Sequence, residues 1–191
     1  MYSVKVSHVL SEFNTDTLPL SAFDYISRAK GKARNERATG MLILNELLQQ
    51  EGISDWSLDI SENGKPFLVG VKLYFSVSHA GGACAVALSD MPIGIDLQDV
   101  ERVERIKAPA AFVKRFFSAR EYGDFLKSPT HAELCRLWTK KEALVKLLGL
   151  RLGDSIFSVS TLDFPNINFK TEELFIDKKF VITIAIQEKQ K

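Results

Sequence analysis

Cysteine is scarce in this chain. Its two thiols, Cys84 and Cys135, stand far apart, form no CxxC pair, and have only 3 histidines in the whole sequence as possible partners at a metal ion. Zinc sites in proteins use clustered cysteine and histidine ligands, which this spacing does not provide. We therefore expect both thiols to be reduced and buried.

Net charge and long apolar runs are nearly absent too. The 25 basic and 24 acidic residues leave a formal charge of +1, so no overall field attracts nucleic acid or an anionic membrane. No apolar run approaches the roughly 20 residues of a membrane-spanning helix, and the N-terminus lacks the pattern of a secretion signal. We expect a cytoplasmic protein that binds neither nucleic acid nor membrane, and whose anion-binding sites are local.

Common nucleotide-binding and hydrolase motifs are missing. The sequence contains no P-loop, no GxGxxG, no GxSxG element and no repeat of fixed period. What remains is a globular composition, since 46 % of the 191 residues are hydrophobic and 26 % are charged. Such a chain has enough apolar surface for one domain or two small ones.

Alternating and helical patterns divide the chain into two parts of the same kind. Alternation predicts strands at 2–10, 73–78, 84–88, 92–98, 155–164, 173–177 and 179–187. Helical spacing predicts helices at 18–30, 33–50, 106–126 and 131–148, with breaks at 62–66 and 128–130. This order predicts an α+β fold with halves at 1–91 and 92–191.

Two of the predicted strands bring polar residues toward a common region. The glycine pair 81–82 permits a tight turn, so we expect a hairpin with Ser78 and His79 at its tip. In the strand that follows this hairpin, Asp96 and Gln98 point away from the apolar face. A buried aspartate there needs a cation or a hydrogen-bond donor, although a capping or turn role for Asp96 explains it equally well.

The predicted helix at 131–148 carries three charged residues of interest. Lys141 falls inside the apolar arc of this helix, where its ammonium must reach water or pair with an anion. Glu142 and Lys146 lie four residues apart at the edge of the arc. This spacing is typical of a solvated ion pair, but it also permits both side chains to face one cleft.

Other residues are candidates for binding phosphate. Ser78, His79 and Lys65 lie at or near predicted turns, where a structural role is equally common. A basic cluster opens the helix at 33–50 and comprises Arg28, Lys30, Lys32, Arg34 and Arg37. A charge run of this kind is usually a solvated face.

Taken in order, several segments resemble the 4′-phosphopantetheinyl transferases of the surfactin-synthetase-activating (Sfp) type. The resemblance runs from Asn63 to Lys146, more weakly upstream to Arg37, and rests on the segments NGKP, FSVSHAGG, PIGIDLQ, RFFSAREY and LWTKKEALVK. It implies a monomeric pseudo-dimer of two similar α+β halves, with coenzyme A bound in the cleft between them. The 92–191 half then carries the metal site.

The resemblance also implies roles for individual residues. Asp96 and Glu142 correspond to the metal-binding carboxylates, and Lys141 and Lys146 to ligands of the coenzyme A diphosphate. Contacts to the coenzyme A nucleotide and its 3′-phosphate correspond to Arg37, Lys65, Ser78 and His79. The family pattern has an acidic residue where this chain has Gln98, whose amide carbonyl can still bind Mg²⁺ but brings no charge.

The implied reaction is the transfer of phosphopantetheine from coenzyme A to a serine of an apo acyl or peptidyl carrier protein, with release of 3′,5′-ADP. In it Asp96, Glu142 and Lys146 are the catalytic residues, Glu142 being the candidate base. Lys114, Arg115 and Arg120 are candidates for a basic face that contacts an acidic carrier. Two alternatives are a non-catalytic module that binds coenzyme A or a carrier, and a scaffold whose basic N-terminal helix binds an acidic partner.

Overall fold

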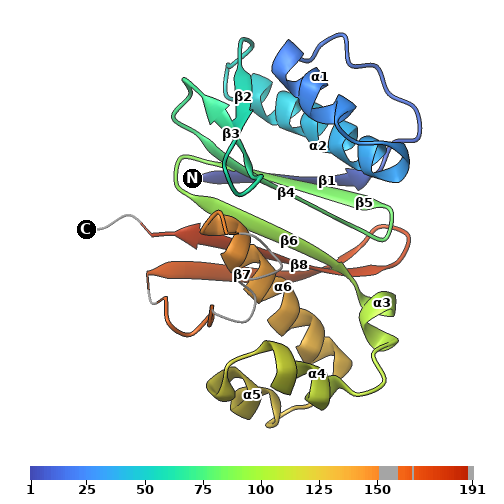
Figure 1. The fold of residues 1–191 in the computed structure, drawn as a ribbon, viewed down its shortest axis with the longest axis vertical. Helices are drawn as coiled ribbons and strands as arrows, with labels where there is room; N and C mark the ends of the chain where they lie inside the picture. The colour runs from blue at the N-terminus through green and yellow to red at the C-terminus, as the bar shows by residue number, and fades with distance from the viewer. Residues whose placement is uncertain (151–158, 165, 189–191) are drawn as a thin grey trace.

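The computed structural model describes residues 1–150, 159–164 and 166–188 (Figure 1). The strands of these ranges are β1 (Tyr2–His8), β2 (Ser57–Ile60), β3 (Pro66–Val69), β4 (Tyr74–Ala80), β5 (Ala83–Ser89), β6 (Ile93–Asp99), β7 (Ile167–Phe175) and β8 (Lys179–Gln187). The helices are α1 (Leu20–Ser27), α2 (Gly31–Gln50), α3 (Val100–Glu104), α4 (Pro109–Phe116), α5 (Ala119–Phe125) and α6 (His131–Leu147). The α+β class expected from the sequence is confirmed.

Two three-stranded antiparallel sheets form the centre of the molecule. The first has the order β1-β5-β4 and the second has the order β6-β8-β7. In both sheets the last strand along the chain lies between the other two. Helices α1 and α2 cover the outer side of the first sheet, and α6 crosses the second sheet, with α4 and α5 at the far end (Figure 1).

Alternation along the strands divides the apolar residues into three layers. In β5, Cys84, Val86 and Leu88 face the core under α2, whereas the alanines between them face the second sheet. In β8, Phe180 and Ile182 pack in the layer between the sheets, and Val181 packs in the core under the C-terminal helices. The buried thiols expected from the sequence are confirmed, since both cysteines are free and buried.

The hairpin between β4 and β5 turns later than the sequence predicts. Its tip is the glycine pair 81–82, where both residues have positive φ, as the tightest hairpin turns require. Ser78 and His79 lie within β4, paired with Ala85 and Cys84 of β5. Their side chains are therefore positioned by a sheet and not by a loop, which corrects the expectation that they form the tip.

Gly94 determines how closely α6 approaches β6. A Cβ atom at this position would lie 2.0 Å from the carbonyl oxygen of Ala143 and 2.5 Å from the amide nitrogen of Leu147. Only a residue without a side chain permits this contact. The helix that carries Glu142 and Lys146 is thus held directly against the strand that carries Asp96.

The predicted helix at 106–126 is wrong in its continuity. The chain forms the two helices α4 and α5 in this range instead, and the break before α5 is a capping box. Ser118 Oγ accepts the amide of Glu121, and the Glu121 carboxylate accepts the amide of Ser118. This reciprocal bonding starts a new helix inside a pattern that is otherwise periodic.

Three further expectations have different outcomes. The hairpin of β2 and β3 was only partly expected, because the sequence analysis assigned 62–66 to a turn without a strand before it. Of the strand expected at 155–164, residues 155–158 lie outside the described residues, and 159–164 form no strand and contain a turn at 161–162. Among the helices that the structure describes, none has the length and hydropathy of a membrane span.

Candidate active site

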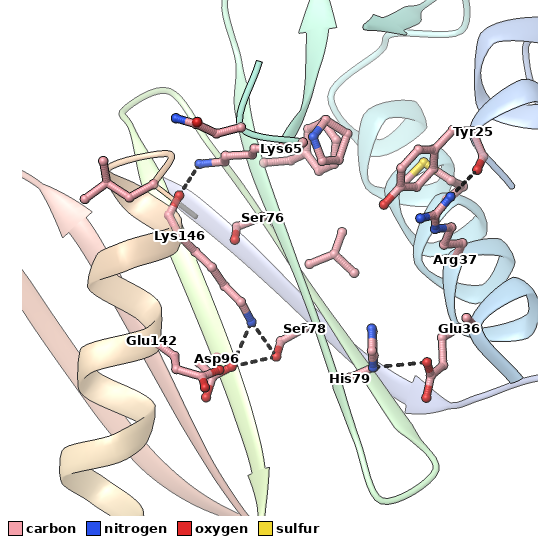
Figure 2. Close-up of a pocket in the computed structure, with 18 of the residues that line it drawn as sticks. Tyr25, Glu36, Arg37, Lys65, Ser76, Ser78, His79, Asp96, Glu142 and Lys146 are labelled. Carbon is pink, nitrogen blue, oxygen red and sulfur yellow. Dashed lines mark hydrogen bonds and ion pairs between the residues drawn. The ribbon is translucent and has the colours of Figure 1, made fainter. Parts of the chain in front are cut away.

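A cavity of about 530 Å³ opens between α2 and α6 (Figure 2). It is lined by α2, β4, β6, α6 and the turn between β2 and β3. Every site residue expected from the sequence except Lys141 lines it: Arg37, Lys65, Ser78, His79, Asp96, Gln98, Glu142 and Lys146. Residues more than 100 positions apart in the chain therefore meet in one site.

A hydrogen-bonded network of Asp96, Ser78 and Lys146 forms the floor of this cavity (Figure 2). Asp96 is 1 % exposed, and its Oδ1 accepts from Ser78 Oγ at 2.9 Å and from Lys146 Nζ at 2.7 Å. The Lys146 ammonium also donates to Ser78 Oγ at 2.8 Å. A buried carboxylate of this kind is stable because an ammonium and a hydroxyl satisfy it.

Ser78 also links the two sheets. Strands β4 and β6 lie side by side but share no backbone ladder. Instead, Ser78 Oγ accepts the amide of Leu97, and Ser76 Oγ accepts the amide of Ile95, both at 3.1 Å. The sequence analysis did not single out Ser76, since an alternating serine in a strand shows no sign of its partner.

Glu142 has the most strongly shifted carboxyl group of the cavity. Burial, and then the nearby Asp96 carboxylate, raise its pKa to about 8, although Lys146 and a hydrogen bond from Trp138 act in the opposite direction. Glu142 is therefore mostly a neutral acid at pH 7, hydrogen-bonded to Asp96. Two carboxyl groups held together in this way form a place where a cation would be stabilised.

The oxygen donors of Asp96, Glu142 and Gln98 fit a hard divalent cation such as Mg²⁺. Gln98 follows two residues after Asp96 in β6, and its Nε2 donates to Asp96 Oδ2 at 3.1 Å. Its carbonyl oxygen reaches a cation beside Asp96 only if the amide turns. Within the described residues, no group of three or more His, Cys, Asp and Glu side chains is placed to hold a metal ion.

Lys65 lines the cavity, but its ammonium is bound to the protein. Nζ donates to the carbonyl oxygen of Lys146 at 2.5 Å and to that of Ile93 at 3.4 Å. Burial, followed by the charge of Lys146, lowers the pKa of Lys65 to about 8. The expected contact of Lys65 with phosphate stays a prediction, because these carbonyls already occupy its ammonium.

Lys141 is not brought to the cavity, which corrects the expectation that it faces the cleft. Its side chain is fully buried, pairs with Glu121 at 3.2 Å, and lies over the ring of Phe117. Burial lowers the pKa of Lys141, and Glu121 partly offsets this effect. Lys141 therefore joins α6 to α5 inside the second half.

Glu121 is satisfied from several sides. It accepts from Lys141, from the Ser118 amide and, through Oε1, from the amide and hydroxyl of Thr161. Burial acts to raise its pKa, but the hydrogen bonds of Thr161 and Ser118 and the charge of Lys141 outweigh this and lower it. The ion pair of Lys141 and Glu121 therefore stabilises the fold, because each charge neutralises the other in the interior.

Arg37 and His79 lie on the opposite wall, across from Lys146 (Figure 2). Arg37 Nη1 donates to the carbonyl oxygen of Tyr25 at 2.8 Å, and its guanidinium lies 4.5 Å from the centroid of the Tyr25 ring. This arrangement fixes the guanidinium at the rim of the cavity. The other members of the basic cluster, Arg28, Lys30, Lys32 and Arg34, are exposed, as a solvated face predicts.

Glu36 is a residue of the cavity that the sequence analysis missed. It is 8 % exposed, and its carboxylate lies 3.2 Å from His79 Nδ1 and 3.6 Å from Lys32 Nζ. Burial lowers the pKa of His79, while Glu36 raises it. A single acidic residue inside a basic run gives no sequence signal that it turns inward.

The fold and the cavity thus define an α+β protein in which basic and acidic side chains from distant segments line one cavity. Residues 92–189 match the family model described as the 4'-phosphopantetheinyl transferase superfamily. The chain belongs to this superfamily, and the resemblance to its Sfp-type members is confirmed.

Three relatives illustrate the similarity. The chain is 37 % identical to the 4'-phosphopantetheinyl transferase psf-1 of Bacillus pumilus over 91 residues, or 46 % of this chain and 37 % of that protein. It is 28 % identical to a 4'-phosphopantetheinyl transferase of Bacillus subtilis over 185 residues, covering 89 % and 80 %. It is 33 % identical to Sfp of Bacillus subtilis strain 168 over 111 residues, covering 56 % and 47 %. The match therefore spans less than half of psf-1 and of Sfp.

Proposed function

We propose that this chain is a magnesium-dependent 4′-phosphopantetheinyl transferase, which moves the phosphopantetheine arm of coenzyme A to a serine of an apo acyl or peptidyl carrier protein. The observation that carries the proposal is the meeting of Asp96, Glu142 and Lys146 in one cavity of a superfamily member. The names of the relatives support the same reaction. The cytoplasmic location stays a prediction.

We further infer that residues 1–91 and 92–191 are two similar halves with the active site in the cleft between them. The matching strand orders β1-β5-β4 and β6-β8-β7 support this inference, as does the long helix that precedes the last two strands of each half. The cavity takes residues from both halves. One chain then contains the complete site, so we expect it to act as a monomer.

The anionic parts of coenzyme A suit the basic groups of the cavity. The Lys146 ammonium and the Ser78 hydroxyl are suited to the diphosphate, because they already bind the carboxylate oxygen of Asp96. Arg37 and His79 on the opposite wall are suited to the nucleotide and its 3′-phosphate. Lys65 is suited to a further contact through the third donor of its ammonium, since the two carbonyls that it binds use only two.

Asp96 and Glu142 are the residues that would hold Mg²⁺, with the Gln98 carbonyl oxygen as a possible third donor. When bound there, the ion neutralises negative charge on the diphosphate oxygens. To hold it, Glu142 must lose the proton that its raised pKa retains.

The chemical step is a displacement at phosphorus. The hydroxyl oxygen of the carrier serine bonds to the phosphorus on the pantetheine side, while the bond from that phosphorus to the departing oxygen of 3′,5′-ADP breaks with its electron pair. The serine proton passes to the Glu142 carboxylate, which lies in the cavity beside Asp96 and is deprotonated once the cation is held. Lys146 stabilises the charge that develops on the leaving group.

A basic surface near the C-terminal helices is the proposed contact for the carrier. Lys114 and Arg115 in the last turn of α4 and Arg120 in α5 are exposed. Carriers with acidic surfaces would be attracted to them. Charge reversal at Lys114 and Arg115 should raise the KM for the carrier and leave the KM for coenzyme A unchanged; an unchanged carrier KM would count against this contact.

The reaction is tested by the intact mass of an apo carrier protein after incubation with this protein, coenzyme A and Mg²⁺. We expect the mass to increase by one phosphopantetheine. We also expect the rate to fall at least about 100-fold in Glu142→Ala and the gain to vanish with a chelator, while the exposed Glu12→Ala should behave as the wild type. Coenzyme A binding without any transfer to several carriers would favour a non-catalytic binding module.

A further inference from the structure

The last turn of α6 accepts two hydrogen bonds from the turn between β2 and β3. Lys65 Nζ donates to the carbonyl oxygen of Lys146 at 2.5 Å, and Asn63 Nδ2 donates to that of Gly149 at 3.0 Å. The donors belong to the first half of the chain and the acceptors to the second. Asn63 and Lys65 also line the cavity.

The end of a helix needs such donors. The last carbonyls of an α-helix have no amide partner within the helix, and the partial negative charge of this end favours a cation. In α6 the Lys146 carbonyl also accepts the Gly149 amide at 3.2 Å, and Gly149 has a positive φ that ends the helix. Lys65 therefore acts on the helix end as a charged cap supplied from another element.

The turn that presents these side chains is itself firmly held. The Ser61 amide donates to the Lys65 carbonyl, and the Lys65 amide donates to Ser61 Oγ. On either side of the turn, Leu58 of β2 and Leu68 of β3 are buried in the core under α2. The positions of Asn63 and Lys65 are thus fixed by the core of the first half.

Lys146 is held at both ends as a result. Its carbonyl is bound by Lys65, while its ammonium binds Asp96 and Ser78 across the cavity (Figure 2). A shift of the last turn of α6 would move this ammonium and, one turn earlier, the Glu142 carboxyl.

We propose that Asn63 and Lys65 are positioning residues, which hold the C-terminal turn of α6 and so fix Lys146 and Glu142 in the cavity. The structural part of this proposal is independent of the reaction, and its catalytic consequence rests on the proposed transferase function. It assigns Lys65 a role toward the backbone of the enzyme, in addition to its place in the lining of the cavity.

Hydrogen exchange of the protein without ligands tests the structural part. In Lys65→Met we expect the amides of Leu148, Gly149 and Leu150 to exchange about tenfold faster, and in Asn63→Ala about threefold faster. Amides near the start of α6 should be unchanged. The exposed Lys72→Met is the matched control, since it removes an ammonium from the neighbouring connection. Unchanged exchange in both variants would overturn the proposal.

Kinetics and binding test the catalytic part. If Lys65 positions α6, Lys65→Met lowers kcat about tenfold or more together with the faster exchange at the end of α6, because both Lys146 and Glu142 move. Lys65→Arg, which keeps a cationic donor, should recover part of kcat. A weaker coenzyme A affinity with unchanged kcat and unchanged exchange would show that Lys65 is a ligand. If no carrier is modified by the wild type, the proposed function fails while the exchange result still decides the structural part.

Discussion

Glu142 and Asp96 show how one residue pair can be destabilising in the empty protein and useful in the loaded one. Both carboxyl groups lie in the same cavity, and the second proton is retained because burial and the Asp96 charge raise the pKa of Glu142 to about 8. A cation removes the cause of this shift, since it replaces the proton between the two groups. The repulsion that would arise if both groups were ionised is thus a physical basis for metal binding.

This pair predicts a pH dependence of stability in the metal-free protein. The pKa of Glu142 is raised from 4.5 to about 8, so between these pH values the folded chain binds a proton that the unfolded chain has lost. The free energy of unfolding therefore falls as pH rises from 4.5 to 8. Glu142→Gln, which stays neutral, should be the more stable protein at pH 8, by up to about 4 kcal/mol.

Urea denaturation in the presence of a chelator, at several pH values between 5 and 9, measures this difference. The exposed Glu51→Gln serves as the control, because it removes a carboxylate far from the cavity. If the difference in the free energy of unfolding between Glu142→Gln and wild type does not grow with pH, the pKa of Glu142 is not raised.

Glu36 and His79 lead to a second prediction at the residue scale. The carboxylate of Glu36 raises the pKa of His79, against burial and against the ammonium groups of Lys146 and Lys32. Glu36→Gln should therefore lower the pKa of His79 further. The imidazole would then be neutral over more of the physiological range and bind phosphate less well.

The His79 prediction is measured by following the imidazole carbon-bound protons by NMR over pH. His79→Gln assigns the signal among the 3 histidines of the chain. Glu46→Gln on the same helix, whose carboxylate pairs with Lys5, is the matched control. The same pKa for His79 in Glu36→Gln and wild type would show that the contact has no electrostatic effect.

Among the elements, α6 shows what a one-dimensional pattern can and cannot predict. Its length, its apolar arc and the inward position of Lys141 follow from 3.6-residue spacing, and all are present in the structure. The spacing cannot tell what covers the arc. One part of it faces the cavity and another faces α5, so Lys141 meets Glu121 while Glu142 meets Asp96.

The Lys141 and Glu121 pair gives a prediction about stability at the scale of these helices. Lys141→Met leaves Glu121 charged and only 1 % exposed, so we expect a loss of about 3–5 kcal/mol in the free energy of unfolding. The double variant Lys141→Met with Glu121→Gln should recover much of this loss, because it leaves no uncompensated buried charge.

Chemical denaturation of both variants, with the exposed Lys127→Met as control, measures this effect. Coenzyme A affinity of the folded protein should not change in Lys141→Met, since Lys141 does not line the cavity. A variant with normal stability and weakened coenzyme A binding would instead support the ligand role expected from the sequence.

At the scale of the whole molecule, the sequence predicts the buried residues well. It predicts less well which helices and strands are neighbours. The strand patterns around Asp96 and Ser78 indicate a buried face, and Glu142 follows from helical spacing. The pairing of β1 with β5, and the approach of the β2 and β3 turn to α6, depend on contacts between distant segments. Periodicity contains no information on such contacts. The hydrogen bonds of Asn63 to the Gly149 carbonyl and of Lys65 to the Lys146 carbonyl could therefore not be predicted.

The layer between the two sheets is unequal on its two sides, which has a consequence for the halves. The first half contributes small side chains at its centre: Ala80, Ala83, Ala85 and Ala87. The second half contributes large ones: Ile93, Ile95, Leu97, Phe180, Ile182 and Ile184. If the chain is divided between residues 91 and 92, the second half exposes a much larger apolar surface than the first, and surfaces of that kind cause association.

We therefore expect residues 92–191 expressed alone to aggregate, and residues 1–91 alone to stay more soluble because alanines bury little area. Co-expression of the two fragments should restore a soluble complex, since the serine hydroxyls of β4 and the apolar layer can form between separate chains. Light scattering and size-exclusion chromatography of each fragment and of the pair measure this. A monomeric, folded 92–191 fragment would contradict this expectation. It would show that the second half does not need the first half to cover its apolar surface.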